Sequence, residues 1–310
     1  MSDQELTAPQ AIAADILVSR FGATRTRAHE TWWSNVVVSG DTADGTVFCK
    51  ASAEHGVRAE AWVATRLREA GVPVPQVLAL GADDRLPGGY WMATAGMPGQ
   101  AWNPNLTSPA QTAMIIADVA RHLHDIHRQH VDGYGWLSDD GHGRWPHWAD
   151  WLTDSCREAL DVVEPTGLLA SGLPDRALHA LRQVPDPPSA SIVNTDLGLS
   201  EILVDPAIGR VSGILDWNSA VAGDALLDVA TFAMGGPAGD PTPLRLAPLL
   251  MDAYAALDPP IRARPAGLPA VYRMLNHLNN ASWSVLNHVD DWTAPLCAEA
   301  ARELTAADLS

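Results

Sequence analysis

The sequence predicts an α+β fold, with a small antiparallel sheet first and a mostly helical region after it that carries a β-hairpin. Residues 24–52 alternate apolar and polar side chains, which is typical of half-buried strands. From residue 108 onward, apolar residues recur at helical spacing over long segments. Within that region two short β-branched runs, 201–204 and 210–215, flank a turn that contains proline and glycine, and this pattern predicts the hairpin.

Length and charge narrow the classes of function. The 310 residues suffice for one large domain or for two lobes, each with its own core. The net charge of −17 argues against a nucleic-acid partner, because phosphate backbones require a basic footprint. The acidic excess is either a general solubility charge or a field that attracts cationic substrates, and charge alone does not separate the two.

The sequence also indicates a compartment. No run approaches the ~18 apolar residues of a transmembrane helix, and the first residues lack the basic and apolar regions of a signal peptide. The cysteines Cys49, Cys156 and Cys297 form neither a metal motif nor an even disulfide set. We therefore expect a reduced cytoplasmic protein without a membrane partner, present as a monomer or a homodimer.

The first hundred residues predict two helices around a sheet. Glycine at position 22 ends the first helix, and glycine and prolines after residue 70 end the second. We expect these helices over 8–21 and 57–70, and strands over 24–29, 35–39, 46–51, 76–80 and 89–95.

Lys50 ends an apolar strand, and a charge at such a place is costly unless a partner compensates it. A phosphate together with Glu60 from the next helix would supply that compensation. The alternative is that Lys50 extends to solvent from the strand end and that Glu60 is an ordinary solvated helix residue.

Two carboxylates mark the hairpin. Asp196 lies on the loop that enters it, and Asp216 lies just beyond its far end. Antiparallel strands of nearly equal length bring these side chains to the same end of the hairpin. Such a pair suits phosphoryl transfer, in which one carboxylate orients or deprotonates a hydroxyl while the other holds Mg²⁺ on a nucleotide phosphate.

The rest of the chain reads as helices. His122, His124, His127 and His130 suggest a metal, but the first two fall on different faces of one helix, so we favour packing and surface roles. The tryptophans at 136–151 suit either stacking on sugar rings or packing. We expect helices over 108–130, 151–163, 175–183, 224–234, 243–257, 268–288 and 291–306.

These motifs together resemble the aminoglycoside phosphotransferase family, whose fold is that of the protein kinases. The family pattern runs His-Gly-Asp, four residues, Asn, a hairpin, Ile-Asp-Trp, then Gly-Asp-Pro and a further Asp. The opening Asp196-Leu-Gly198 and the pair Asp216-Trp217 are most similar to the hygromycin B phosphotransferase branch. In this chain the pattern reads Asn194-Thr195-Asp196, Glu201, Leu215-Asp216-Trp217, Gly223-Asp224-Ala225 and Asp228.

The resemblance implies a bilobal protein-kinase-like fold, with an N-lobe over 1–97 and a C-lobe over 98–310. It implies that Asp196 is the catalytic residue and that Asp216 binds Mg²⁺. Glu201 stands where the family has Asn, and its carboxylate can also ligate Mg²⁺.

The resemblance also implies a nucleotide site, for ATP or GTP. Lys50 and Glu60 would orient the phosphates, with Ser34 and Asn35 as further donors. Backbone groups near Met92 and Thr94 would meet the base.

The implied function is a small-molecule kinase that phosphorylates a hydroxyl of an antibiotic, in particular an aminoglycoside or aminocyclitol such as a hygromycin-like compound. Acidic residues, among them Asp139 and Asp140, would then bind the cationic substrate. Three departures from the pattern, Asn194, Thr195 and Glu201, leave open a pseudokinase that binds without turnover. Thr195 in place of glycine restricts the backbone unless φ is negative there. A nucleoside antibiotic, a metabolic alcohol and an unrelated fold are further alternatives.

Overall fold

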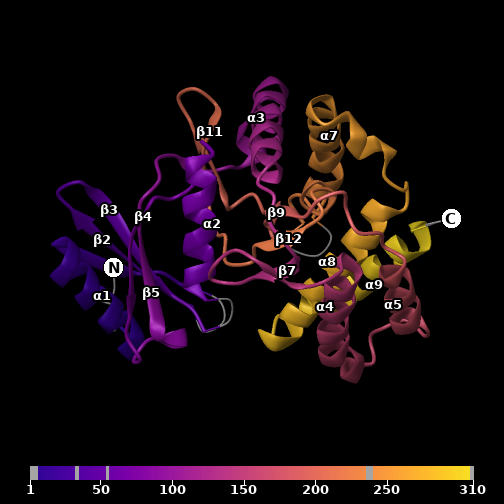
Figure 1. The fold of residues 1–310 in the computed structure, drawn as a ribbon, viewed down its shortest axis with the longest axis horizontal. Helices are drawn as coiled ribbons and strands as arrows, with labels where there is room; N and C mark the ends of the chain where they lie inside the picture. The colour runs from indigo at the N-terminus through magenta and orange to yellow at the C-terminus, as the bar shows by residue number, and fades with distance from the viewer. Residues whose placement is uncertain (1–5, 32–34, 54–55, 235–239, 308–310) are drawn as a thin grey trace.

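The N-terminal part of the protein is an antiparallel sheet in the strand order β1-β2-β3-β5-β4. The computed structural model describes residues 6–31, 35–53, 56–234 and 240–307. Figure 1 shows this sheet on one side of the molecule and most of the helices on the other. The strands are β1 (Arg25–Ala28), β2 (Val36–Thr42), β3 (Gly45–Ala51), β4 (Val77–Ala82) and β5 (Tyr90–Ala95).

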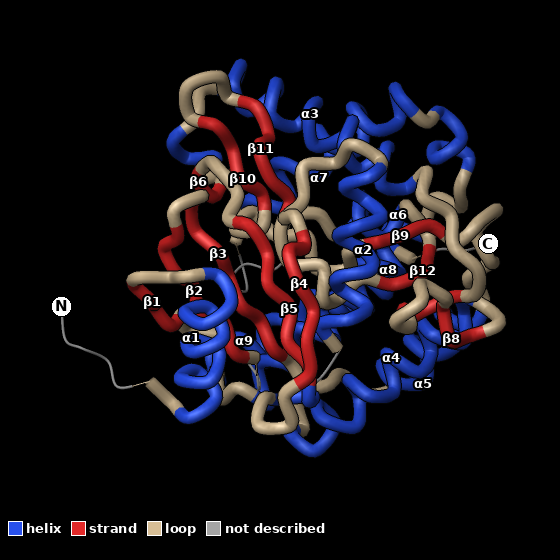
Figure 2. The backbone as a smooth tube through the Cα atoms, turned by 60° about the vertical axis from the view of Figure 1, so that its left-hand side comes forward, coloured by secondary structure: helices blue, strands red, loops and turns tan. Residues whose placement is uncertain are grey.

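Two helices, α1 (Ala8–Phe21) and α2 (Val57–Glu69), cover opposite faces of the sheet (Figures 1 and 2). Leu17 of α1 packs with buried side chains of one face, including Ala93. Met92, the preceding residue of β5, points to the other face and packs on α2. The alternation in the sequence therefore gives each helix one apolar face of the sheet to cover.

Helix α2 also joins the sheet to the rest of the protein. Its residues Val57 and Ala61 pack on the sheet, whereas Val63 and Leu67 belong to the large core of the C-terminal part. Figure 1 shows α2 standing between the two parts. A residue on α2 is therefore placed by contacts with both parts of the molecule.

The C-terminal part is built mainly from helices, as predicted. The helix predicted over 108–130 ends at residue 127, because residue 130 pairs with Ser191 in a β-bridge. The helices are α3 (Pro109–His127), α4 (Trp148–Val163), α5 (Leu173–Arg182), α6 (Leu226–Ala230), α7 (Thr242–Leu257), α8 (Leu268–Leu286) and α9 (Asp290–Ala306).

The helix predicted over 224–234 is wrong in extent, because α6 spans five residues. Asp224, the first residue of that range, lies before the helix, and its carboxylate accepts a hydrogen bond from the Leu226 amide at 3.1 Å, as a capping residue would. The Asp224 carboxylate is buried in an ion pair with Arg264, at 2.6 Å, and accepts a hydrogen bond from the Tyr272 hydroxyl at the same distance. Contacts with α8 and the segment before it thus fix this part of the chain, and helix propensity does not.

Two small sheets complete this part, in the orders β11-β10-β6 and β8-β7-β12-β9. Most of their strands have two to four residues and were not predicted, because so short a segment shows no clear period. The strands are β6 (Gln100–Ala101), β7 (Tyr134–Leu137), β8 (Gly143–Trp145), β9 (Ser191–Val193), β10 (Ile202–Asp205), β11 (Arg210–Ile214) and β12 (Val221–Gly223).

The chain passes between the two parts just after β5. The first sheet ends at Ala95, and Gln100 in β6 already pairs with β10 of the hairpin. The lobe boundary that we propose after residue 97 falls in this crossing. Across the described ranges, no helix combines the length and the apolar character needed to span a membrane.

Candidate functional site

Lys50 and Glu60 form an ion pair where the sheet meets α2. The Lys50 ammonium lies 2.9 Å from Oε2 and 3.1 Å from Oε1 of Glu60. Both side chains are largely buried, with 14% and 8% of their areas exposed. The predicted pair is thus present, and the alternative of two separately solvated residues is wrong.

The same ammonium reaches across to the C-terminal part of the protein. Nζ of Lys50 donates a hydrogen bond to Oδ1 of Asp216 at 2.8 Å. Burial lowers the pKa of Lys50, but the charges of Glu60 and Asp216 outweigh burial and raise this pKa above its usual value. Lys50 is therefore a fixed positive charge that connects the two parts.

The hairpin of β10 and β11 brings Glu201 and Asp216 together at its base. Ile202 lies opposite Ile214, and the Leu215 amide donates to the Glu201 carbonyl at 2.8 Å, so Glu201 is adjacent to Asp216 at the base of the hairpin. The hairpin therefore supports two of the three carboxylates of the candidate site.

The far end of the hairpin is anchored to α3 by a buried carboxylate. Asp118 accepts hydrogen bonds from the Val211 amide at 2.9 Å and from the Arg210 guanidinium at 2.9 Å. Its side chain is 1% exposed. We expect this anchor to fix the orientation of the hairpin, and no local pattern in the sequence indicated it.

Asn194 links the loop of Asp196 to the loop of Asp216. Its amide nitrogen donates to the Asp216 carbonyl at 3.0 Å, and its amide oxygen accepts from the Asp196 backbone N–H at 3.1 Å. Asn194 is completely buried. In place of the family's histidine, Asn194 thus holds the two proposed functional aspartates in a fixed relation.

A second buried carboxylate, Asp228, supports this loop from behind. It accepts hydrogen bonds from the backbone N–H groups of Asn194 and Thr195, each at 3.0 Å. It also bonds to Nε2 of His127 at 3.0 Å, and Nδ1 of His127 reaches the Tyr254 hydroxyl at 2.8 Å. His127 therefore has a supporting role in the core.

The backbone of the loop is strained at two residues that are not glycine. Thr195 has φ +67° and Asp216 has φ +56°, both in the left-handed region. The negative φ considered for Thr195 is thus wrong. Its hydroxyl donates to the Ser219 carbonyl at 2.9 Å and, with the hydrogen bond to Asp228, holds the threonine in this conformation.

The three carboxylates leave an excess of negative charge. The Asp196 side chain is open to water on one side. The protein around it nonetheless removes much of its hydration, and together with the charges of Glu201 and Asp216 this raises the pKa of Asp196 to about 7. Burial likewise raises the pKa of Glu201; a hydrogen bond from Ser200 opposes the rise and the charge of Asp216 adds to it. A cation bound here would relieve this repulsion.

The residues fit Mg²⁺ in one particular manner. Within the described ranges, no group of three or more His, Cys, Asp or Glu side chains is arranged to enclose a metal ion. Mg²⁺ is commonly bound by one or two carboxylates together with substrate phosphates and water. Asp216 and Glu201 suit that arrangement, in which a nucleotide supplies the remaining ligands.

The residues expected to meet the nucleotide base lie on β5. Met92 pairs with Lys50 of β3 and with Leu80 of β4, and Thr94 pairs with Phe48 and Val77. Both residues thus lie on a strand between β3 and β4, and the expected contact of backbone groups near them with the base stays a prediction. Their side chains share the face of the sheet that carries Lys50.

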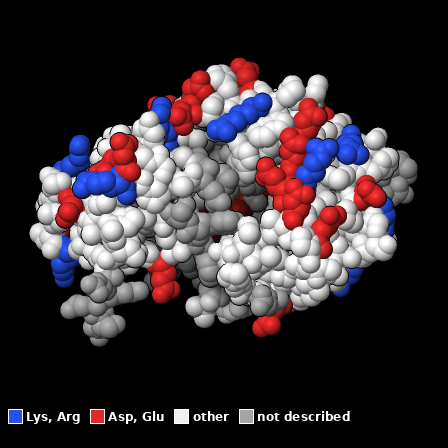
Figure 3. Space-filling view, turned by 90° about the horizontal axis from the view of Figure 1, so that it is seen from below, with Lys and Arg blue, Asp and Glu red and all other residues white. Residues whose placement is uncertain are grey.

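Asn35 lies directly before β2, and its side-chain oxygen is buried without a hydrogen-bond partner. This free capacity is consistent with a polar ligand close by. Ser34, the other predicted phosphate donor, lies outside the described residues. Figure 3 shows a hollow between the two parts of the molecule, with acidic atoms visible inside it.

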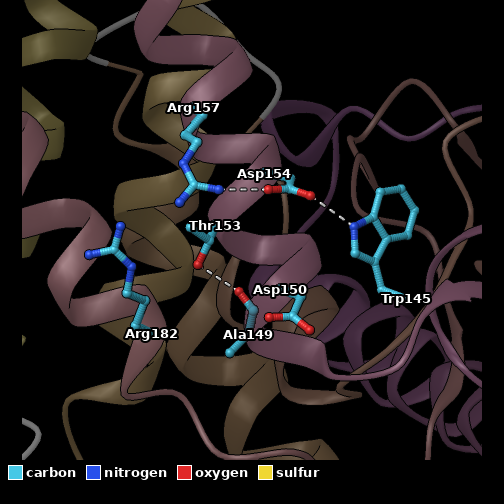
Figure 4. Close-up of a pocket in the computed structure, with 7 residues that line it drawn as sticks. All are labelled: Trp145, Ala149, Asp150, Thr153, Asp154, Arg157 and Arg182. Atoms are coloured by element: carbon cyan, nitrogen blue, oxygen red, sulfur yellow. Dashed lines mark hydrogen bonds and ion pairs between the residues drawn. The ribbon is translucent and has the colours of Figure 1, made fainter.

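The tryptophan-rich segment mainly supports the core. Trp148 and Trp151 are buried, and their rings stack with centroids 4.8 Å apart. Trp145 donates to Asp154 at 3.0 Å and borders a surface pocket of about 420 Å³ beside α4 (Figure 4). That pocket shares no residue with the candidate site.

The fold is kinase-like. Residues 26–282 match the phosphotransferase enzyme family known as APH, and the chain belongs to that family. A comparison with curated protein sequences gave no match.

Solved structures agree in fold. A thermostable mutant of aminoglycoside phosphotransferase APH(4)-Ia, in a ternary complex with AMP-PNP and hygromycin B, has a TM-score of 0.72 at 18% identity, covering 97% of this chain and 99% of that chain. A candidate aminoglycoside phosphotransferase from Ralstonia eutropha has a TM-score of 0.65 at 17% identity, covering 96% of this chain and 99% of that chain. A candidate fructosamine-3-kinase from Thermobifida fusca has a TM-score of 0.63 at 18% identity, covering 96% of this chain and 98% of that chain. At these identities the likeness shows the fold.

Proposed function

We propose that this phosphotransferase transfers the γ-phosphate of ATP, or of GTP, to a hydroxyl group of an antibiotic. The observation that carries the proposal is the position of Lys50, which contacts Glu60 of α2 and Asp216 of the hairpin loop at the same time. Phosphoryl transfer depends mainly on positioning and on charge neutralisation, and a lysine held by carboxylates from two parts of the protein serves both.

In this proposal Lys50 exchanges partners when the nucleotide binds. Glu60 keeps the ammonium in place, while Asp216 gives up its contact with Lys50 and becomes available as a ligand. Lys50 then donates to the α- and β-phosphates. Met92 and Thr94 would border the base with their side chains, and Asn35 would add a donor or an acceptor.

Mg²⁺, when bound by Asp216 and Glu201, would neutralise charge on the nucleotide phosphates. Asp196 would orient the acceptor hydroxyl and take up its proton. A pKa near 7 suits that role, because the carboxylate is then a stronger base than an ordinary aspartate yet is largely ionised at slightly alkaline pH. Asn194 would keep Asp196 at the correct distance from Asp216.

For the acceptor we propose an aminoglycoside or aminocyclitol, in the manner of hygromycin B. The short motifs Asp196-Leu-Gly198 and Asp216-Trp217 support this branch, and so does the fold of the hygromycin B complex. A cationic acceptor also suits a site with excess negative charge. We place the protein in the cytoplasm, as a monomer or a homodimer, where such a resistance enzyme would meet its substrate.

A metabolic alcohol is the competing acceptor, because a candidate fructosamine-3-kinase shares the fold. A pseudokinase is the competing class. Glu201 favours it, since a longer and negatively charged side chain beside Asp196 replaces a neutral amide.

The test is the release of ADP or GDP by purified protein with Mg²⁺, over a panel of antibiotics that includes hygromycin B and a panel of sugar amines. Asp196→Asn should abolish substrate-dependent release. The matched control is Asp205→Asn, at the turn end of the same hairpin, which should retain it. Nucleotide binding without release over both panels would favour the pseudokinase, and equal activity of the two variants would contradict the role of Asp196.

A further inference from the structure

The tip of the β7–β8 hairpin, residues 138–142, touches the outer side of α2. Nη1 of Arg58 lies 3.1 Å from Oδ2 of Asp139 in the tip. Gly141 approaches Trp62 so closely that a Cβ atom on this glycine would lie 2.1 Å from the indole ring. The tip therefore packs on α2 through one ion pair and one close steric contact.

The contacting residues lie on the face of α2 opposite to Glu60. Arg58 and Trp62 are four positions apart and share one face of the helix, whereas Glu60 lies two positions from each, about 200° around the axis. Glu60 points to Lys50 and the tip lies behind it. The tip thus contacts α2 on the side away from Lys50.

The tip is closed by hydrogen bonds among its own residues. The Ser138 amide donates to the His142 carbonyl at 2.9 Å, and the Gly141 amide donates to the Ser138 carbonyl at 2.9 Å. The Ser138 hydroxyl also accepts from the His142 amide, at 3.1 Å. Gly141 has φ +84°, which an L-residue adopts only at a cost.

The same hairpin is connected to the loop of Asp196. Strand β7 pairs with β12, which pairs with β9, and β9 leads directly into Asn194 and Asp196. Trp136 of β7 and Val193 of β9 both lie opposite Val221, so the tip and the proposed catalytic loop leave the sheet at the same end, on different strands.

We propose that the 138–142 tip is a positioning strap that holds Glu60 on Lys50 and sets this pair at a fixed distance from Asp196. The strap rests on the proposed function, since it aligns the proposed phosphate-binding pair with the proposed catalytic residue. Arg58, Asp139, Trp62 and Gly141 are positioning residues, and none of them needs to touch the nucleotide. Asp139 accordingly serves the strap in place of the substrate-binding role considered from the sequence.

The main test is Gly141→Ala with Gly167→Ala as its matched control. Both glycines have positive φ, +84° and +69°, so both variants bear backbone strain. An alanine at 141 would meet Trp62, whereas nothing lies within 4 Å of a Cβ at 167. Gly141→Ala must therefore displace the tip, the Trp62 ring or α2, and the control must not.

We expect Gly141→Ala to lower kcat by roughly 10- to 100-fold, because a misplacement of about 1 Å at a reacting centre can cost about 100-fold. The nucleotide KM should change less, since the base contacts are untouched. Hydrogen–deuterium exchange should increase in α2, over residues 57–69. Gly167→Ala should leave all three quantities near those of the wild type.

A milder pair of variants keeps the test valid if Gly141→Ala folds poorly. Arg58→Ala removes the ion pair, and Arg66→Ala removes an exposed arginine further along the same helix. We expect a two- to fivefold loss of kcat, roughly, for Arg58→Ala, because a half-exposed pair contributes little. Asp139→Ala should match it, and the double variant should lose no more than either single one.

The outcomes separate the strap from the proposed function. Equal kcat and equal exchange in Gly141→Ala and Gly167→Ala would overturn the strap, even in an active kinase. Increased exchange of α2 in Gly141→Ala alone, in a protein that transfers no phosphate, would support the strap and count against the proposed function. Additive losses from Arg58→Ala and Asp139→Ala would contradict their pairing.

Discussion

Substitutions at Thr195 would measure the backbone strain in the candidate site. Its φ of +67° is in the left-handed region, where a β-branched residue is unusual, and its hydroxyl donates to the Ser219 carbonyl at 2.9 Å. We predict that Thr195→Gly is more stable than Thr195→Ala. At most positions the order is the reverse, because glycine loses more backbone freedom on folding.

The magnitude follows from three contributions. Both variants lose the hydrogen bond to Ser219, which costs each of them about 0.5–1.5 kcal/mol and cancels from the comparison. The left-handed conformation costs alanine about 1–2 kcal/mol and costs glycine almost nothing. The greater freedom of glycine in the unfolded chain offsets about 0.5–1 kcal/mol of this. The glycine variant should therefore be more stable by roughly 0.5–1 kcal/mol.

Urea denaturation of both variants at one pH gives the comparison, with Thr107 as the matched control. Thr107 has φ −113°, and its hydroxyl also donates to a backbone carbonyl, that of Pro104, at 3.1 Å. There the alanine variant should be the more stable. If alanine is favoured at both threonines, the left-handed strain assigned to Thr195 does not exist.

Two further predictions concern charge. Arg264→Met leaves the Asp224 carboxylate buried without its 2.6 Å partner and should lower the free energy of unfolding by about 3 kcal/mol or more. Arg262 forms an exposed ion pair with Asp252, so Arg262→Met should lower the free energy of unfolding by less than about 1 kcal/mol. Urea denaturation of both variants gives the comparison, and equal losses in Arg264→Met and Arg262→Met would refute the argument. For the active protein, kcat/KM should rise with pH through about 7, because Asp196 must lose its proton to act as a base. Glu201→Gln removes a negative charge that raises this pKa, so the inflection should move to lower pH, and an unmoved or upward-moved inflection would contradict the assignment.

The sequence predicted what depends on local patterns. Alternation of apolar and polar residues identified β2 and β3, an apolar run identified β5, helical spacing identified α1 and α3, and glycine and prolines marked the end of α2, because each of these signals lies within one segment of the chain. The ion pair of Lys50 and Glu60 could also be predicted, since a charge on an apolar strand requires a partner.

Contacts between distant segments could not be predicted in this way. Asn194 has two partners, the Asp196 amide and the Asp216 carbonyl, and the second lies far along the chain. The contact between Gly141 and Trp62 joins two segments whose local patterns are unrelated. Nothing in either segment signals the other, because such contacts depend on how the small sheets place their loops.

Over its described ranges the structure shows two kinds of carboxylate, those with a cationic partner inside the protein and those without one. The buried carboxylates Asp118, Asp224 and Asp228 each have an arginine or a histidine partner, together with backbone donors. Among the described residues, Asp196 and Glu201 form no ion pair, and each has a raised pKa. Charge that the fold neutralises is part of the fold, whereas charge that it leaves in excess is available to a ligand. For this reason we propose that a cation would bind at the base of the hairpin and not on the acidic surface.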